Sequence, residues 1–197
     1  SGHFARWSPD GSRLVVIAYG ADRDHQTVTI HDAKTGALLS TLPLTPDANG
    51  LITVPDALWS PDGSRVATVT EQGIGTTEVI EIWDAATAER LYTLQGKQFS
   101  WSPDGTRLAI AQNDGTVMIQ TLSGDLVYSI VDPNLLLYDV AWSPDGRYVA
   151  TLDRYGSLKV WPVWPTTDAL VSYAQACCLA REFTAAERQQ FGLPAAP

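Results

Sequence analysis

The stretch Trp-Ser-Pro-Asp-Gly occurs four times in the chain, as Trp7-Ser8-Pro9-Asp10-Gly11, Trp59-Ser60-Pro61-Asp62-Gly63, Trp101-Ser102-Pro103-Asp104-Gly105 and Trp142-Ser143-Pro144-Asp145-Gly146. From one tryptophan to the next, the spacings are 52, 42 and 41 residues. A repeat of about 40–45 residues is typical of the four-stranded blades of a β-propeller. The repeat therefore predicts four blades, and the longer first spacing predicts insertions in the first of them.

Each copy of this stretch has the chemistry of a tight turn. Proline presets φ at the first corner, aspartate caps nearby backbone amides, and glycine takes a corner that other residues tolerate poorly. An apolar or β-branched run follows each copy, such as residues 13–19 after the first. We therefore interpret each stretch as the hairpin between the first and second strands of a blade, with structural roles for its tryptophan, proline, aspartate and glycine.

Alternating and apolar runs indicate the other strands of each blade. In the first blade, the second to fourth strands are expected at 13–19, 27–32 and 37–42. The corresponding strands are expected at 66–69, 79–84 and 90–94 in the second blade, and at 108–111, 116–119 and 126–130 in the third. The pattern predicts an all-β chain of four-stranded antiparallel blades.

The fourth blade departs from this plan after its third strand, at 158–161. Pro162 and Pro165 stand where a turn and a fourth strand should follow, and proline cannot serve a paired central strand. The last blade is therefore expected to be incomplete. We divide the chain into four blades over 1–162, at about 1–42, 54–94, 97–130 and 137–162, and a C-terminal helical extension over 163–197.

The extension carries the signals of two helices. Thr166-Thr167-Asp168 caps the first, and Thr184-Ala185-Ala186-Glu187 is a capping box that opens a second, short one. Spacing by three and four residues groups the apolar side chains of the first helix into one stripe. We expect the extension to dock on the blades through the residues Leu170, Tyr173, Cys177 and Phe183.

Composition narrows the classes of function. With 45% apolar and 18% charged residues the chain is globular, and its formal net charge is −9. The 13 basic residues are scattered rather than clustered, so we expect no nucleic-acid surface. No apolar run approaches the roughly 18 residues of a membrane span. No signal peptide opens the chain, and the adjacent Cys177 and Cys178 read as free thiols, so we expect a cytoplasmic protein.

Nothing in the sequence indicates catalysis, and we expect neither an enzyme nor a cofactor. The histidines His3, His25 and His31 show no metal-binding spacing with one another, and no Gly-x-Ser-x-Gly elbow occurs. The most irregular surface segments are the first insertion and the linker to blade two. Irregular loops often carry binding residues, so the predicted partner contacts are Asp22, Asp24, His25, Asp47 and Asn49.

With these features the chain resembles the WD-repeat β-propellers in their bacterial form. The resemblance covers residues 1 to about 162 and depends on the four turns and on third strands that end in Trp-Asp. Trp83-Asp84 matches this ending fully, Trp161 keeps the tryptophan, and His31-Asp32 keeps the aspartate. The tail from Thr167 to Leu193 resembles the helical extension of bacterial members. The resemblance implies a signalling or scaffold module that binds proteins, as the C-terminal part of a larger protein with an effector domain upstream.

The resemblance also implies that the ring is incomplete. Such propellers usually have seven blades, and the last blade borrows its outermost strand from the start of the chain. Blade four lacks that strand, and no residue before His3 could provide it. We therefore expect half a ring, completed by a separate half-propeller or by an identical second copy. An open half-ring would expose flat apolar sheet faces on blades one and four.

A second interpretation comes from another class of protein. The gating or substrate-access propellers of peptidases, and TolB-like propellers associated with transport, also use Ser-Pro-Asp-Gly turns. The Trp-Asp ending of a third strand, at Trp83-Asp84, favours the scaffold interpretation. Fold alone does not name the bound partner.

Overall fold

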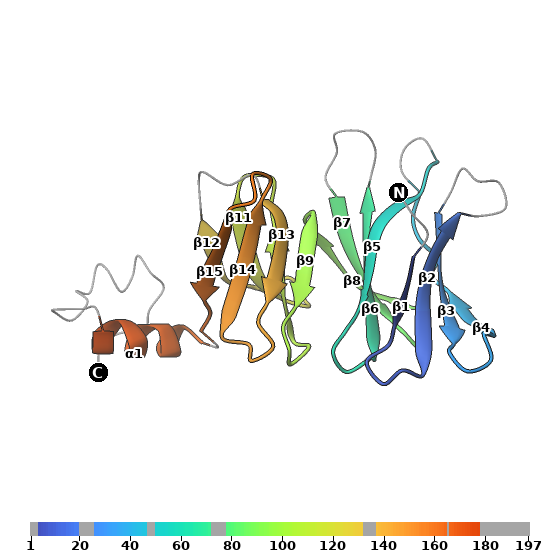
Figure 1. Cartoon of the computed structure of the whole chain (residues 1–197), viewed down its shortest axis with the longest axis horizontal. Coiled ribbons are helices and arrows are strands. Elements are labelled where there is room, and N and C mark those ends of the chain that lie inside the picture. The colour runs from blue at the N-terminus through green and yellow to red at the C-terminus, as the bar shows by residue number, and fades with distance from the viewer. Residues whose placement is uncertain are drawn as a thin grey trace. The chain divides into compact units, whose positions relative to one another are not determined.

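The computed structural model of this chain describes residues 4–19, 26–46, 50–71, 78–131, 137–164 and 166–177. Their strands form four antiparallel sheets, which we call blades one to four in chain order (Figure 1). Blades one to three have four strands each and blade four has three. The predicted fold class is therefore confirmed, with an incomplete last blade followed by a short helix.

The strands succeed one another in chain order within every blade. Blade one consists of β1 (Phe4–Trp7), β2 (Arg13–Tyr19), β3 (Gln26–Asp32) and β4 (Leu38–Thr41). Blade two consists of β5 (Thr53–Trp59), β6 (Arg65–Glu71), β7 (Glu78–Asp84) and β8 (Arg90–Gln95). Blade three consists of β9 (Gln98–Trp101), β10 (Arg107–Ala111), β11 (Thr116–Thr121) and β12 (Leu126–Val131), and blade four of β13 (Leu137–Trp142), β14 (Tyr148–Asp153) and β15 (Leu158–Pro162).

The four turns set the same register in every blade. The tryptophan that opens a turn lies opposite the third residue after the turn glycine, in the pairs Trp7–Leu14, Trp59–Val66, Trp101–Leu108 and Trp142–Val149. Side chains directly opposite one another share a face of an antiparallel sheet. Each turn tryptophan therefore lies on the same face of its own blade.

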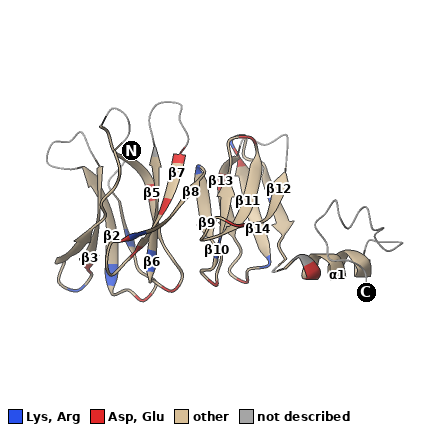
Figure 2. Cartoon of the chain, turned by 180° about the vertical axis from the view of Figure 1, so that it is seen from behind, with Lys and Arg blue, Asp and Glu red and all other residues tan. Residues whose placement is uncertain are grey.

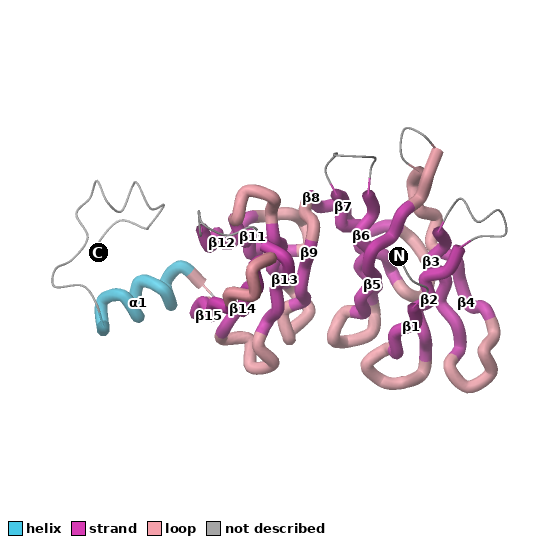
Figure 3. Tube along the Cα trace, turned by 45° about the horizontal axis from the view of Figure 1, so that its top comes forward, coloured by secondary structure: helices cyan, strands magenta, loops and turns pink. Residues whose placement is uncertain are grey.

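This common register lets us name the two faces of a blade. The leading face carries the turn tryptophan, and the trailing face carries the residues that alternate with it. The trailing face of each blade packs against the leading face of the next, and β9 lies beside β13 in the same way (Figure 3). Blades two and three are thus buried on both faces.

Two apolar clusters show this packing in detail. The trailing face of blade one and the leading face of blade two share one cluster, which includes Val15, Ile17, Val28, Ile30, Trp59 and Val66. Blades two and three share the other, which includes Ala67, Val69, Ile80, Ile82, Trp101 and Leu108. Burying one such aliphatic side chain contributes about 1.5–3 kcal/mol before the entropy cost of folding is subtracted.

After β15 the secondary structure changes from strands to a helix. The described residues contain no fourth strand for blade four, and the helix α1 (Thr167–Cys177) follows instead. The Thr166 hydroxyl accepts a hydrogen bond of 3.1 Å from the Ala169 amide, as an N-cap residue does. The chain divides into two compact units, Ser1–Trp161 and Pro162–Pro197. The predicted second helix, which the capping box at 184–187 would open, lies outside the described residues.

Candidate functional site

The turns use their aspartates to hold the backbone. In blade two, the Asp62 carboxylate accepts hydrogen bonds from the Ser60 hydroxyl and from the amide and hydroxyl of Ser64, and the Gly63 amide donates 2.9 Å to the Ser60 carbonyl. The Ser60 hydroxyl bond, with those from Ser64, lowers the pKa of Asp62 to about 2. The same serine-to-aspartate bond recurs at Asp10, Asp104 and Asp145, and acidic residues mark these turns in Figure 2.

The third strands end in hydrogen bonds of their own. In blade two, the Trp83 indole donates 3.0 Å to the Thr68 hydroxyl, and Asp84 accepts from two amides of the following turn. In blade four, the Trp161 indole donates 3.0 Å to the Thr151 hydroxyl. Each indole bond ties the third strand of its blade to the second strand, on the leading face.

Arginine side chains fasten neighbouring blades together. The Arg13 guanidinium lies 4.9 Å from the centroid of the Trp59 ring and donates 2.6 Å to the Gly63 carbonyl and 3.3 Å to the Ala85 carbonyl. The Trp59 indole in turn donates 3.1 Å to the Arg6 carbonyl. Cation–π stacking and charge-assisted bonds are both strengthened in such a partly buried place.

The same contact recurs further along the chain. The Arg107 guanidinium of blade three lies 5.3 Å from the Trp142 ring of blade four. The turns also touch, because a Cβ placed on Gly63, Gly105 or Gly146 would lie 3.5–3.7 Å from the δ-carbon of the preceding turn's proline. We call this arrangement, an arginine over the next tryptophan and a proline beside the next glycine, the turn contact.

The turn of blade one has no such neighbour. Trp7 is 62% exposed, whereas its equivalents Trp59, Trp101 and Trp142 are only 8–9% exposed. A Cβ placed on Gly11 would meet no atom within 4 Å. Leu14 and Val16, which share the leading face with Trp7, are only half-buried. The leading face of blade one is thus uncovered.

Blade four has the opposite face uncovered. Because Trp161 binds Thr151 on the leading face, the alternating residues Val160 and Leu158 belong to the trailing face, and they are 59% and 66% exposed. Ala150 and Leu152 lie on the same face of β14 and are half-buried. The expectation of apolar faces at both ends of the blade array thus agrees with the exposed fractions of these side chains.

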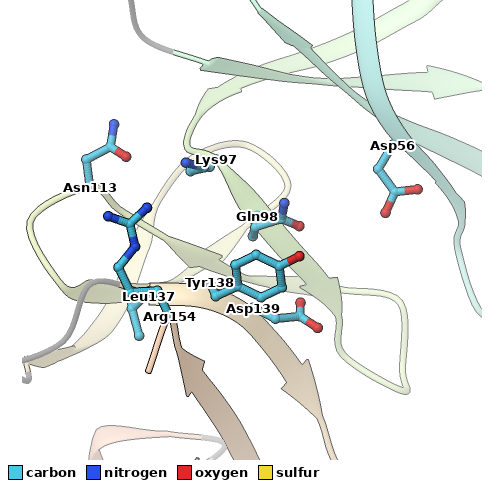
Figure 4. Close-up of a pocket in the computed structure, with 8 residues that line it drawn as sticks. All are labelled: Asp56, Lys97, Gln98, Asn113, Leu137, Tyr138, Asp139 and Arg154. Carbon is cyan, nitrogen blue, oxygen red and sulfur yellow. The ribbon is translucent and has the colours of Figure 1, made fainter. Parts of the chain in front are cut away.

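A pocket of about 570 Å³ opens where the inner strands of blades two, three and four begin (Figure 4). It is lined by Asp56, Lys97, Gln98, Asn113, Leu137, Tyr138, Asp139 and Arg154. Figure 4 shows Lys97, Asn113 and Arg154 at one end and Asp56 at the other. The pocket therefore has two basic side chains, Lys97 and Arg154, at one end and the carboxylate of Asp56 at the other.

The acidic residues of the pocket are placed by local irregularities of their strands. Asp56 and Asp139 each stand three residues before a turn tryptophan, next to a shift of register in β5 and β13. Each carboxylate accepts 2.8 Å from the amide of the next residue. Asp56 also pairs with Arg6 at 3.0 Å, whereas no ion pair in the described part of the chain involves Lys97 or Arg154.

The predicted contact residues do not contribute to this pocket. Asp22, Asp24, His25, Asp47 and Asn49 lie outside the described residues, as does Phe183 of the predicted docking stripe. The pocket residues were missed because they come from different blades. The one available signal was the recurrence of aspartate three residues before a turn tryptophan, at Asp56 and Asp139.

Within the second unit, α1 places two of the predicted docking residues. Leu170 and Tyr173 are both exposed, and the Tyr173 ring lies 5.3 Å from the ring of Trp164 between their centroids. For Cys177, the structure describes only its position at the end of α1. Docking of the extension on the blades therefore stays a prediction.

Two absences hold for the residues that the structure describes. In those ranges, no helix combines the length and apolar character needed to cross a membrane. The same residues contain no group of three or more His, Cys, Asp or Glu side chains placed to hold a metal ion.

Comparison with known proteins supports the fold. A family model described as "Anaphase-promoting complex subunit 4 WD40 domain" matches residues 99–165. The chain is also similar to a chain of the "Crystal Structure of Mitotic Checkpoint Complex", with a TM-score of 0.62 and 18% sequence identity. That match covers 81% of this chain and 45% of the other, so this chain spans less than half of its length. The comparison with curated proteins found no match.

Together with the four turns and the blades, these matches support a β-propeller of the WD40 type.

Proposed function

We propose that this chain is a protein-interaction scaffold or sensor, a partial propeller that is completed by a second half-propeller or by a second copy. Its role is binding rather than catalysis, in a signalling protein of the bacterial cytoplasm. The resemblance of its turns and tail to bacterial WD-repeat proteins supports this setting.

One observation carries the proposal, namely that the end faces are built like the internal ones. Trp7 stands in the register of three tryptophans that the preceding blade covers. Ala150, Leu152, Leu158 and Val160 occupy the places that Ala67, Val69, Ile80 and Ile82 fill in the buried trailing face of blade two. Exposed apolar patches of this kind usually mark an interface.

The comparisons support a role in assembly. The matching family is described as the WD40 domain of a subunit of one complex, and the similar structure is described as another complex. The pocket lined by Asp56, Lys97 and Arg154 adds a second surface, whose basic and acidic ends suit a polar peptide segment.

Site-specific photo-crosslinking tests the proposal. A photoreactive amino acid is placed at Trp7 in the full chain, and irradiation is done in the cells that produce it. Crosslinked peptides are then identified by mass spectrometry. We expect adducts to a sheet face of a propeller blade, either of this chain or of another polypeptide.

The matched control carries the same photoreactive group at Tyr92, an exposed aromatic residue of the outer strand β8. If Trp7 gives no more adduct than Tyr92, or only adducts to unrelated folds, the completion of the propeller by other blades is wrong.

A further inference from the structure

We infer that the pocket binds a peptide segment of mixed charge, with an acidic side chain of the peptide against Lys97 and Arg154 and a basic side chain against Asp139. The inference rests on the protein-binding role in the proposed function, and it names the part of the partner that binds here. All residues that line the pocket belong to the first compact unit, Ser1–Trp161.

The pocket is lined by positions that recur from blade to blade. Three residues before the turn tryptophan, blades two, three and four carry Asp56, Gln98 and Asp139. One residue earlier, blades three and four carry Lys97 and Tyr138. The turn stretch is identical in all four blades, whereas these equivalent positions differ in charge and in hydrogen-bonding groups. The repeat therefore varies where its residues line the pocket.

The backbone holds the two basic residues of the pocket in place. Arg154 lies in the hairpin between β14 and β15, where the buried Asp153 carboxylate accepts hydrogen bonds of 2.8 Å from two amides of the hairpin. Lys97 directly precedes β9, and its amide donates 3.2 Å to the Ala111 carbonyl. Because both backbone positions are already fixed, a ligand loses less of its binding free energy to ordering the chain.

The opposite charges of the pocket are held apart rather than paired. Figure 4 shows the carboxylates of Asp56 and Asp139 on the side away from the Arg154 guanidinium. Among the described residues, no ion pair joins a basic residue of the pocket to an acidic one. The Asp56 carboxylate pairs with Arg6, so Asp139 is the pocket carboxylate without an ion pair in the described part of the chain. A ligand that carries both charges would supply the missing counter-charges.

The lining favours a peptide over a small molecule. Small-molecule pockets are lined mainly by apolar and aromatic side chains, whereas Leu137 is the one aliphatic residue that lines this pocket. Gln98 and Asn113 carry amides that can pair with the backbone of an extended peptide. A free amino acid has its two backbone charges on neighbouring groups, but the pocket holds its own charges beyond the reach of an ion pair. Two side chains of one peptide can span that separation.

The balance of charge favours a carboxylate over a phosphate. The Arg154 guanidinium can donate two parallel hydrogen bonds to a carboxylate, and Lys97 adds a point charge beside it. A phosphate carries about −1.5 to −2 charges at pH 7, and the Asp139 carboxylate in the same pocket would repel it more strongly than a single charge. We therefore expect glutamate or aspartate at the basic end.

Fluorescence anisotropy with short synthetic peptides tests the inference. The probes have blocked termini and a neutral dye, and each carries one glutamate and one lysine, in both orders and at a series of spacings. The reference peptide has glutamine and methionine at these places. We expect the best charged peptide to bind the full chain about 10-fold more tightly than its reference, and less tightly as the salt concentration rises.

Pairing variants of the pocket with variants of the peptide identifies each contact, as a double-mutant cycle does. Arg154→Gln should weaken the charged peptide about 10-fold, but it should not affect the peptide with glutamine in place of glutamate. Asp139→Asn retains an oxygen for the bond from the Val140 amide. It should weaken the charged peptide, but not the peptide with methionine in place of lysine.

A pair of lysines provides the matched control. Lys97→Gln should weaken binding of the charged peptide by about 3-fold or more, because it removes one of the two positive charges at the basic end. Lys34→Gln removes the charge of an equally exposed lysine in the turn after β3 of blade one, outside the pocket. The Lys34→Gln chain should bind the peptide like the unaltered chain.

Three results would overturn the inference. In the first, no charged peptide binds more tightly than its uncharged reference. In the second, neither Arg154→Gln nor Asp139→Asn changes the affinity of the charged peptide, which would place its binding elsewhere on the chain. In the third, a phosphoserine peptide binds more tightly than the glutamate peptide and does not need the lysine, which would assign a phosphate to the pocket.

The crosslinking at Trp7 separates this inference from the proposed function. If no charged peptide binds but the photoreactive group captures a propeller blade, the peptide ligand is wrong and the proposed function stands. If the peptide binds as expected but no blade is captured, the pocket ligand stands and the completion of the propeller by other blades is wrong.

Discussion

Blades two and four are built from the same parts but differ in what covers them. Both contain the Trp-Ser-Pro-Asp-Gly turn and an indole-to-threonine hydrogen bond, formed by Trp83 in one and Trp161 in the other. Ile82 of blade two is fully buried, whereas the equivalent Val160 of blade four is 59% exposed. The difference shows that the sequence of a blade places apolar side chains on both of its faces. Whether these side chains are buried depends on a neighbouring blade.

The largest expected effect is the difference in stability between a substitution at Ile82 and one at Val160. Ile82→Ala removes atoms from a packed cluster and should lower the free energy of unfolding by about 2–5 kcal/mol. Val160→Ala removes exposed atoms and should cost less than about 0.5 kcal/mol at low protein concentration. Urea denaturation of both variants measures the two costs. Equal losses in a dilute monomer would mean that this chain itself covers the trailing face of blade four.

Two arginines near the turns, Arg13 and Arg147, allow a second comparison between covered and uncovered blades. Arg13 stacks on Trp59 and donates to two carbonyls of blade two, so Arg13→Ala should lower the free energy of unfolding by about 1–3 kcal/mol. Arg147 of blade four is 75% exposed and pairs only with Asp145 of its own turn, so Arg147→Ala should cost less than about 0.5 kcal/mol.

The control for this pair is Arg13→Lys, which keeps the charge but loses the planar stacking and the forked donation. It should be destabilised nearly as much as Arg13→Ala. Full stability of the lysine variant would show that charge alone, rather than the geometry of the turn contact, holds blades one and two together.

Much of the fold could be predicted because the turns and strands of each blade have signals in short stretches of sequence. The four turns fix the first hairpins, and the predicted third strand at 79–84 differs from β7 (Glu78–Asp84) by one residue. Pro162, the last residue of β15, and Pro165 predicted that blade four lacks a fourth strand, as it does in the described part of the chain. These features depend on residues near in sequence, whose turn chemistry and alternation are visible without coordinates.

The pocket could not be predicted because it is assembled from distant segments. Asp56, Gln98 and Asp139 come from three inner strands, and Arg154 comes from the hairpin between β14 and β15. Their approach depends on how the blades pack and on the register shifts beside Asp56 and Asp139. Sequence reasoning favoured irregular loops instead, and those lie outside the described residues.

The smallest expected effect concerns acid, and it compares the turn of a covered blade with that of an end blade. Hydrogen bonds from Ser60 and Ser143 lower the pKa values of Asp62 and Asp145, respectively, to about 2 in the folded chain, from an ordinary value of 3.8. The unfolded chain therefore takes up these protons first as the pH falls. The stability that the carboxylates provide is complete above about pH 4 and is lost as the pH approaches 2.

Asp62→Asn should accordingly flatten the fall in unfolding free energy between about pH 5 and pH 2, by roughly 1 kcal/mol after allowance for solvent screening of an exposed carboxylate. Asp145→Asn should flatten it over the same interval, because the same serine-to-aspartate bond is present in the uncovered blade. Urea denaturation at several pH values measures both slopes. If only Asp62→Asn changes the slope, the turn of blade four is not formed in solution as it is in blade two. The shared turn would then depend on a neighbouring blade, as burial of the sheet faces does.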